Sequence, residues 1–300
     1  MLRMAIAVLL TFVSPTADNP GNLAMTRYVP DGLPSGRPVV VALHGCTQTA
    51  SAYGTGSGWL ELADRLRFTV VLPEQKTANN LSRCFNWFER GDTTRGQGEV
   101  ESIAQMVRQT VAETGADPSR VYVTGLSAGG AMTAAMLATY PELFAGGGIV
   151  AGVAYRCAAT MIEAFSCMNP GRNLTPATLG GAVRSASPHA GPWPTVSVWQ
   201  GSADYTVAPA NATELVEQWT NVHGIPATPT RTDTVAGYPH AVYESGGRVV
   251  VQRYTITGMG HGQPVDPGAG TAQCGRAGAY VLDVNVCAAW HMGTAWHLAD

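Results

Sequence analysis

Short apolar runs alternate with helix-length segments along this chain, and that alternation constrains the fold more than any other feature. Residues 39–43 are apolar throughout, as expected for a strand that is covered on both faces of a sheet. Residues 69–72 form a second apolar run, and residues 59–67 between them repeat apolar side chains at helical spacing. The pattern predicts an α/β fold whose mainly parallel central sheet has helices on both faces.

The same pattern continues toward the C-terminus. No internal repeat or second core is evident, so we expect residues 18–300 to form a single domain with irregular insertions at about 154–192 and 262–288. The further predicted elements are a helix over 99–114, a strand over 121–124, a helix over 131–140, and strands over 149–153, 195–200 and 249–256.

The composition excludes several classes of protein. Hydrophobic residues make up 45% of the 300 residues, which is enough for a large core, and only 13% are charged. Eighteen basic residues against 21 acidic ones give a net charge of -3, which supplies no positive field for phosphates. We therefore expect neither a disordered chain nor a nucleic-acid-binding protein.

The N-terminus has the pattern of a secretory signal peptide. Arg3 precedes a run over residues 4–13 that is apolar except for Thr11, and small and turn-forming residues follow. We predict a leader over residues 1–17 with cleavage after Ala17; the alternative is a buried N-terminal strand. No other run approaches the length of a membrane-spanning helix, so we expect a secreted, extracellular protein without a membrane segment.

Six cysteines, an even number in a chain expected to leave the cytoplasm, predict three disulfides. Fifteen pairings are possible for six cysteines. The spacing lacks the Cys-x-x-Cys and His-x-x-x-His patterns of common metal sites, so no metal is expected. Clustering of the cysteines in twos along the chain favours Cys46–Cys84, Cys157–Cys167 and Cys274–Cys287.

Residues 125–129 read Gly-Leu-Ser-Ala-Gly, a match to the G-x-S-x-G pattern of a nucleophile elbow. An apolar strand precedes the match and a helix of small residues follows it, which is the context such an elbow requires. Gly125 and Gly129 leave room where strand and helix backbones meet, so that Ser127 is exposed as a nucleophile. The alternative is an ordinary glycine-rich turn before a helix.

A serine hydroxyl needs a neighbouring base and a third group that orients the base. Asp204 lies on a loop just after a predicted strand, where an orienting carboxylate belongs, although a turn-capping role is the alternative. His261 follows the next predicted strand on a glycine-rich loop, which completes the chain order serine, acid, histidine. Less suitable contexts surround the other candidates, which are Asp233, Asp266, Asp283, His189, His223, His240, His291 and His297.

An acyl-transfer site also needs two backbone donors for the negative oxygen of the tetrahedral intermediate. Ala128, directly after the nucleophile, is expected to supply one N–H group. We assign the other to Cys46, on the loop after the strand at 39–43. Because only the Cys46 backbone acts, its sulfur is free to form a disulfide that holds the loop.

Four segments together resemble the poly(3-hydroxybutyrate) depolymerase-type esterase family of α/β-hydrolases, which also contains feruloyl and acetylxylan esterases. The resemblance covers about residues 25–262 and implies a secreted serine esterase with Ser127, Asp204 and His261 as its triad. Members of this family often carry a tryptophan soon after the catalytic histidine, whereas Gln263 and Pro264 follow here. The four segments are LHGCTQTASAYG (43–54), RCFNWF (83–88), GQGE (96–99) and VYVTGLSAGGAM (121–132).

Trp87, Phe88 and Trp199 are candidates for an aromatic platform that binds an ester. Trp199 lies within a predicted strand, where a core role is favoured, and Trp87 is the substrate-binding candidate retained. We expect hydrolysis of polyhydroxyalkanoate-type esters without a cofactor, with feruloyl or acetyl esters of plant cell walls as the alternative. A non-catalytic binding protein with the same scaffold is the alternative from another class.

Overall fold

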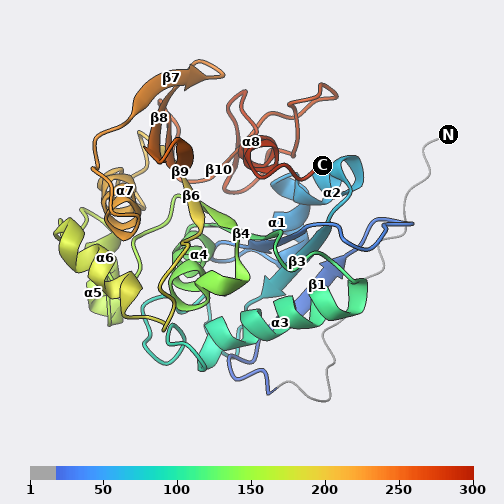
Figure 1. Cartoon of the computed structure of the whole chain (residues 1–300), viewed down its shortest axis with the longest axis horizontal. Helices are drawn as coiled ribbons and strands as arrows, with labels where there is room; N and C mark the ends of the chain where they lie inside the picture. The colour runs from blue at the N-terminus through green and yellow to red at the C-terminus, as the bar shows by residue number, and fades with distance from the viewer. Residues whose placement is uncertain (1–17) are drawn as a thin grey trace.

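The computed structural model describes residues 18–300, so the predicted leader at 1–17 lies outside the described residues. A nine-stranded sheet has the order β1-β3-β2-β4-β5-β6-β9-β8-β7 (Figure 1). The six strands from β3 to β9 in this order run parallel, while β1 pairs antiparallel with β3 at one edge and β8 pairs antiparallel with both β9 and β7 at the other. A mainly parallel sheet with covering helices is the predicted α/β fold.

Among the described residues, the strands of the main sheet are β1 Ala24–Tyr28, β2 Val39–Leu43, β3 Thr69–Glu74, β4 Val121–Leu126, β5 Gly146–Val150, β6 Thr195–Gly201, β7 Arg231–Val235, β8 Tyr238–Ser245 and β9 Arg248–Ile256. The helices are α1 Ala50–Gly56, α2 Trp59–Leu66, α3 Gly98–Thr114, α4 Ala128–Thr139, α5 Met161–Met168, α6 Pro176–Arg184, α7 Ala210–Val222 and α8 Ala288–Ala295, with a 3₁₀ turn at Pro141–Leu143. A separate pair of short parallel strands comprises β10 Gln263–Val265 and β11 Val281–Asp283.

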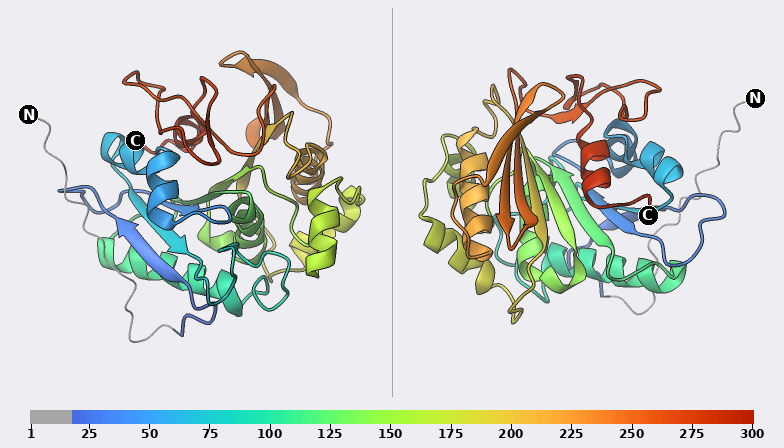
Figure 2. Two further views of the ribbon diagram at one scale, coloured as in Figure 1. Left: turned by 180° about the vertical axis from the view of Figure 1, so that it is seen from behind. Right: turned by 45° about the horizontal axis from the view of Figure 1, so that its top comes forward.

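Helices cover the sheet on both faces, which is why its central strands are buried along their whole length (Figure 2). Apolar side chains of α3, α4, α6 and α7 form one core cluster with one face of the strands. Side chains of α1, α2 and α8 form the second cluster on the opposite face. Burial on both faces explains why β2 reads as a continuous rather than an alternating apolar run.

Three predictions about the elements need correction. The strand predicted at 149–153 is β5, which begins at Gly146 and ends at Val150. Its glycines lie where helices pack closely, since a Cβ on Gly148 would lie 1.9 Å from the Met292 sulfur of α8 and one on Gly147 would lie 2.6 Å from a methyl carbon of Leu137 on α4. The insertions at 154–192 and 262–288 are not irregular, because the first contains α5 and α6 and the second contains β10 and β11. Helix α4 also begins at Ala128 rather than at 131.

The three predicted disulfides are present: Cys46–Cys84, Cys157–Cys167 and Cys274–Cys287. The first joins the loops that follow the neighbouring strands β2 and β3. The second joins the loop before α5 to α5 itself, and the third joins the loop between β10 and β11 to the start of α8. Within residues 18–300, no helix has the length and apolar character needed to cross a membrane.

Candidate active site

Ser127 occupies a sharp turn between β4 and α4 at the centre of the sheet. Its backbone has φ 58° and ψ -118°, a left-handed conformation that is strained for a residue with a side chain. The turn is tight because a Cβ on Gly129 would lie 2.2 Å from the Leu43 carbonyl oxygen, and one on Gly125 would lie 2.4 Å from the Gly129 oxygen. Glycine is therefore required at both positions, and this geometry is the predicted nucleophile elbow.

Asp204 lies on the loop after β6, and four hydrogen-bond contacts fix its side chain. One carboxylate oxygen, Oδ1, accepts hydrogen bonds from the backbone N–H groups of Thr206 at 2.9 Å and Val207 at 2.8 Å. The other, Oδ2, accepts from Nε2 of Gln200 at 3.1 Å and lies 2.8 Å from Nδ1 of His261. Asp204 is only 2% exposed, so these donors replace the water that the carboxylate loses.

His261 lies on the loop after β9, and its ring orientation follows from the contact with Asp204. An ionised carboxylate can only accept hydrogen bonds, so Nδ1 of His261 carries the hydrogen and donates it. Nε2 is then the unprotonated ring nitrogen of the neutral imidazole. This is the tautomer that a general base for a serine hydroxyl requires.

Ser127 and His261 line one pocket of about 170 Å³, and Asp204 is attached to it through His261. Residues far apart in sequence thus meet beyond the carboxyl ends of β4, β6 and β9, where ligands bind in open parallel sheets. The other residues lining this pocket are Gly45, Cys46, Thr47, Gln48, Leu126, Met168, Thr206 and Tyr280.

The loop after β2 carries Cys46 into the same pocket. The Cys46–Cys84 disulfide, with an S–S distance of 2.02 Å, joins this loop to the loop after β3. Thr47 also donates its backbone N–H to the Ser82 carbonyl oxygen at 2.7 Å. Ala128 is the first residue of α4, a position whose N–H group has no partner within a helix. Both predicted backbone donors therefore belong to segments that border Ser127.

His44, which sequence reasoning left without a role, fixes the start of that loop. It is fully buried, and burial lowers the pKa of its imidazole, so the ring is neutral. Its Nε2 accepts the backbone N–H of Gln75 at 3.1 Å, which leaves Nδ1 to donate to the Gly45 carbonyl oxygen at 2.8 Å. The only feature of the sequence that could have indicated this role is the position of His44 directly after the apolar strand.

Glu99, the last residue of the GQGE segment, anchors the loop that carries Trp87. Its carboxyl group accepts from the side chain of Gln75 and from the backbone N–H of Asn86, the latter at 2.9 Å. Burial, and secondarily the nearby Asp92, raises the pKa of Glu99 well above its usual range. The carboxyl group is therefore a structural support of this loop, and it does not line the Ser127 pocket.

The three aromatic candidates have different positions. Trp199 is fully buried and stacks on Tyr254 with ring centroids 3.7 Å apart, which confirms its core role. Phe88 is also part of the core, so its proposed place in a binding platform is wrong. Trp87 alone borders Ser127, at a small apolar recess of about 30 Å³.

Tyr280 is a pocket residue that sequence reasoning missed. Its ring lies at a steep angle to that of His261, with centroids 6.2 Å apart. Gln263, which follows His261 closely, is fully buried and accepts a hydrogen bond from the Tyr53 hydroxyl at 3.0 Å. Pairing of β10 with β11 brings Tyr280 back to the histidine. No local pattern around residue 280 indicates this return.

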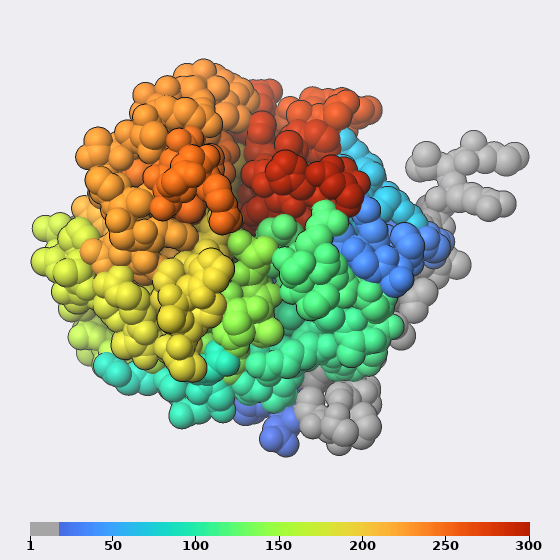
Figure 3. Space-filling model, in the orientation of Figure 1, coloured from blue at the N-terminus to red at the C-terminus, as the bar shows by residue number. Residues whose placement is uncertain are grey.

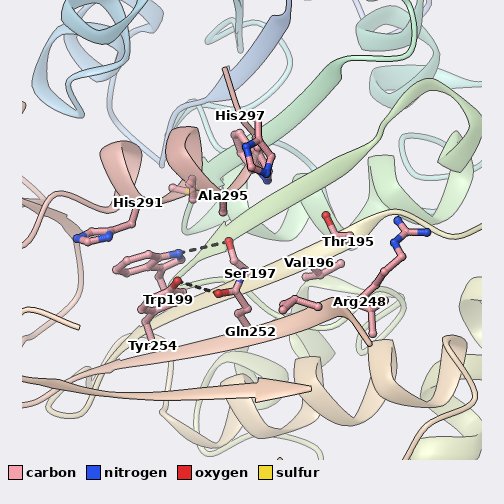
Figure 4. A pocket seen from close by; sticks show the side chains of 14 residues that line it. Thr195, Val196, Ser197, Trp199, Arg248, Gln252, Tyr254, His291, Ala295 and His297 are labelled. Carbon is pink, nitrogen blue, oxygen red and sulfur yellow. Dashed lines mark hydrogen bonds between the residues drawn. The ribbon is translucent and has the colours of Figure 1, made fainter. Parts of the chain in front are cut away.

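A second aspartate–histidine pair and a larger cavity lie elsewhere. Asp233 and His240 approach to 2.6 Å on β7 and β8, but Nε2 of His240 is already paired with Gln252 at 3.0 Å. The cavity, about 440 Å³, lies between α8 and the strands β6 and β9 (Figures 3 and 4). Ser197, Trp199, Gln252 and Tyr254 form its floor. His291 and His297 also line it, but Ser127, Asp204 and His261 do not. We therefore place the chemistry in the smaller pocket.

Among residues 18–300, no group of three or more His, Cys, Asp and Glu side chains is placed to hold a metal ion. Two further histidine candidates, His223 and His291, pack against other parts of the chain. His223 is half-buried and lies 3.1 Å from the Pro194 carbonyl oxygen, and His291 lies on α8, as its predicted helix-packing context indicated.

A mainly parallel sheet with a strand–elbow–helix unit at its centre defines the α/β-hydrolase class, here in the form of an esterase. Residues 23–236 match the family described as Esterase PHB depolymerase, and the chain belongs to this family. The resemblance noted from its four sequence segments is thereby confirmed.

Three relatives illustrate the range of the family. The chain is 58% identical over 286 residues to poly(3-hydroxyalkanoate) depolymerase C of Paucimonas lemoignei, covering 95% of this chain and 69% of that protein. It is 33% identical to feruloyl esterase B of Talaromyces stipitatus, covering 89% and 75%. The solved acetyl xylan esterase of Aspergillus awamori superposes with a TM-score of 0.77 at 31% identity, covering 84% of this chain and 93% of that one. The chain is accordingly a carboxylic ester hydrolase.

Proposed function

We propose that this chain is a secreted serine esterase that cleaves short hydroxyalkanoate esters through an acyl-serine intermediate. The observation that carries the proposal is the arrangement of Ser127 on a strained elbow in one pocket with His261, whose Nδ1 lies 2.8 Å from buried Asp204. We propose that residues 18–300 act as one catalytic domain after removal of the leader.

In the proposed mechanism, Nε2 of His261 takes the proton of the Ser127 hydroxyl as its oxygen attacks the ester carbonyl carbon. Asp204 holds the imidazole in the required tautomer and stabilises it when it becomes charged. The N–H groups of Cys46 and Ala128 donate to the developing oxyanion, and losing one such donor typically costs about 2.7–4 kcal/mol in barrier height. His261 then protonates the leaving alcohol, and a water molecule that it activates releases the acid.

Pocket size favours a short acyl group. The recess beside Ser127, lined by Trp87, Ala131 and Val153 among others, has a volume of about 30 Å³. A recess of this size favours a small acyl group over an aromatic ring. The main pocket, at about 170 Å³, is smaller than the roughly 300–1,000 Å³ typical of drug-sized ligands. These volumes support a hydroxybutyrate unit over a feruloyl group, with an acetyl ester as the alternative that also fits.

A substrate panel tests this proposal. We expect the wild-type protein to cleave soluble hydroxybutyrate oligomers faster than methyl ferulate or acetylated xylan, and Ser127→Ala to cleave none of them. Release of ferulate alone would overturn the preferred substrate. Equal rates for wild type and Ser127→Ala on a short-chain p-nitrophenyl ester would overturn the catalytic assignment and favour a binding role.

Secretion is tested separately, because the leader is a prediction from the sequence. We expect the protein to be recovered outside the cell with its mature N-terminus at residue 18 and its cysteines oxidised. Recovery of the intact N-terminus from inside the cell would contradict this part of the proposal.

A further inference from the structure

Two of the segments that carry the family resemblance have no part in the proposed mechanism, namely RCFNWF (83–88) and GQGE (96–99). The structure joins them, because the Glu99 carboxyl group accepts the backbone N–H of Asn86 at 2.9 Å. Neither of these two residues lines either of the cavities that contain Ser127. Any effect that they have on the reaction must therefore pass through the residues they contact.

Glu99 lies in the first turn of α3 and is only 1% exposed. Its two carboxyl oxygens accept hydrogen bonds from different segments, Oε1 from the side chain of Gln75 and Oε2 from the backbone N–H of Asn86. Both donors are uncharged, so burying the carboxyl group costs free energy that an apolar side chain would not cost. A carboxyl group adds two acceptor atoms that bind two separate donors at once. The chemistry at this position thus suits the joining of two loops.

Gln75 connects Glu99 to the loop that carries the N–H group of Cys46. Its Nε2 also donates to the Cys84 carbonyl oxygen at 3.1 Å, and Cys84 is disulfide-bonded to Cys46. Its Oε1 accepts from the side chain of Asn79 at 2.7 Å, which fixes the amide with its NH₂ group toward Glu99 and Cys84. The carboxyl group of Glu99 therefore supports the proposed oxyanion donor through one side chain and one disulfide.

Asn86 connects Glu99 to Trp87, the next residue along the chain. Trp87 lines the recess of about 30 Å³ beside Ser127. The side chain of Asn86 is held as well, since its Nδ2 donates to a carboxyl oxygen of Asp92 at 3.2 Å. The other oxygen of Asp92 accepts the backbone N–H of Glu99, also at 3.2 Å. A closed set of hydrogen bonds thus fixes the backbone next to Trp87 relative to Glu99.

The backbone of Glu99 is enclosed by two other segments. A Cβ on Gly21 would lie 2.5 Å from the Cα of Glu99, and a Cβ on Gly98 would lie 2.3 Å from the Gly91 carbonyl oxygen. The chain on both sides of Glu99 therefore has little room to shift. Its carboxyl group cannot follow a partner that is displaced.

We propose that Glu99 is a positioning residue of the esterase, which holds the Cys46 donor and the Trp87 wall in fixed places beside Ser127 and thereby sets both the rate and the preferred acyl length. The inference rests on the proposed function, because it takes the Cys46 N–H to bind the oxyanion and the recess at Trp87 to bind the acyl group. A donor must lie about 2.7–3.1 Å from the developing negative oxygen to stabilise it. Apolar pockets distinguish substrates that differ by one methylene group, so a displaced wall alters the discrimination itself.

Glu99→Gln tests this proposal with almost no change in side-chain volume. Glutamine has one acceptor oxygen, so it accepts from Gln75 or from Asn86, and its NH₂ group then faces the other donor. The segment that loses its hydrogen bond is released. Asp92→Asn is a milder second variant, because it opposes only the side-chain NH₂ group of Asn86 and leaves the Glu99 carboxyl group in place.

Glu214→Gln is the matched control. Glu214 is also buried, at 4% exposed, and its carboxyl group also holds a loop by accepting backbone N–H groups, from Arg172 at 3.0 Å and from Asn173. None of these three residues lines a cavity that contains Ser127. The control therefore alters a buried carboxyl group without altering the walls of the site.

The assay compares acyl chains on a common leaving group. Values of kcat and KM are measured for p-nitrophenyl acetate, butyrate and octanoate, and active sites are counted by titration with a p-nitrophenyl alkylphosphonate. The ratio of kcat/KM between two substrates does not depend on how much of the protein is folded. It therefore separates a positioning role from a purely structural one.

For Glu99→Gln we expect kcat per active site on the butyrate ester to fall at least about tenfold, because a small misplacement of a site wall slows the chemical step. We expect the octanoate-to-butyrate ratio of kcat/KM to rise about tenfold, because a displaced Trp87 enlarges the recess. Trp87→Ala, which opens the recess directly, should raise the same ratio. Asp92→Asn should raise it to a smaller extent, and Glu214→Gln should leave both quantities unchanged.

An unchanged ratio in folded Glu99→Gln would overturn the proposal. A change of the same size in Glu214→Gln would also overturn it, by showing that loss of any buried carboxyl group has this effect. If Glu99→Gln does not fold, the ratio measured for Asp92→Asn decides in its place. Absence of hydrolysis by the wild type would refute the proposed function and this inference with it, whereas an active wild type with unchanged ratios in the variants would refute the inference alone.

Discussion

Replacing Asp204 by asparagine changes one atom and tests the proposed role of the buried carboxylate. Oδ1 accepts two backbone N–H groups, at 2.9 and 2.8 Å, so the asparagine oxygen is held there and its NH₂ group faces His261. An NH₂ group can only donate, which forces Nδ1 of His261 to accept and moves the imidazole hydrogen to Nε2. The ring then has no lone pair available for the Ser127 proton.

We expect kcat for p-nitrophenyl butyrate to fall about 10⁴-fold in Asp204→Asn, the loss seen for the same change in a serine-protease triad. That factor corresponds to about 5.4 kcal/mol of barrier height. KM should change little, because Asp204 does not line the pocket. Circular dichroism and unfolding curves establish that the variant is folded.

Asp233→Asn is the matched control. Asp233 also pairs with a histidine, His240 at 2.6 Å, but neither residue lines the Ser127 pocket. We expect this variant to keep kcat within twofold of wild type. A fall of less than tenfold in Asp204→Asn, or equal losses in the two variants, would refute the assignment of Asp204 as the orienting group.

Two further predictions concern the elbow and its support. Gly129→Ala should prevent expression of folded protein, because the added Cβ would lie 2.2 Å from the Leu43 carbonyl oxygen; a soluble variant with wild-type melting temperature and activity would contradict the close packing. His44 has a lowered pKa, so the unfolded chain binds its proton first and stability falls as pH drops below about 6.5. Urea unfolding between pH 6.5 and 5 measures this dependence. For each unit by which the pH is lowered, the free energy of unfolding of His44→Gln should fall by up to about 1.4 kcal/mol less than that of wild type. Equal slopes in the two proteins would contradict burial of a neutral ring.

The sequence predicts those parts of the fold that depend on local patterns. Continuous apolar runs indicate β2 and β3, and the G-x-S-x-G match between strand and helix indicates the turn at Ser127. The clustering of cysteines in twos is sufficient for all three disulfides. The strand and elbow signals lie within a short stretch of chain, where propensity and spacing carry information, and the Cys46–Cys84 pair, 38 residues apart, follows from the order of the cysteines along the chain.

The parts that the sequence does not predict depend on contacts between distant segments. Gln200 donates to Asp204 and His44 accepts from Gln75, but nothing in either local sequence distinguishes these buried polar contacts. Tyr280 reaches His261 only because β10 and β11 pair. The sequence does not predict the start of β5 at Gly146, because glycine is rare in strands and the reason for these glycines, the close approach of α4 and α8, is tertiary.

Covalent labelling tests the central claim most directly. A p-nitrophenyl alkylphosphonate reacts with a serine that is activated by a neighbouring base, and mass spectrometry of the digested protein identifies the residue that carries it. We predict one equivalent on Ser127, with loss of esterase activity in proportion to labelling, and no label on Ser127→Ala. Labelling of another serine, or full activity in the protein labelled at Ser127, would contradict the account.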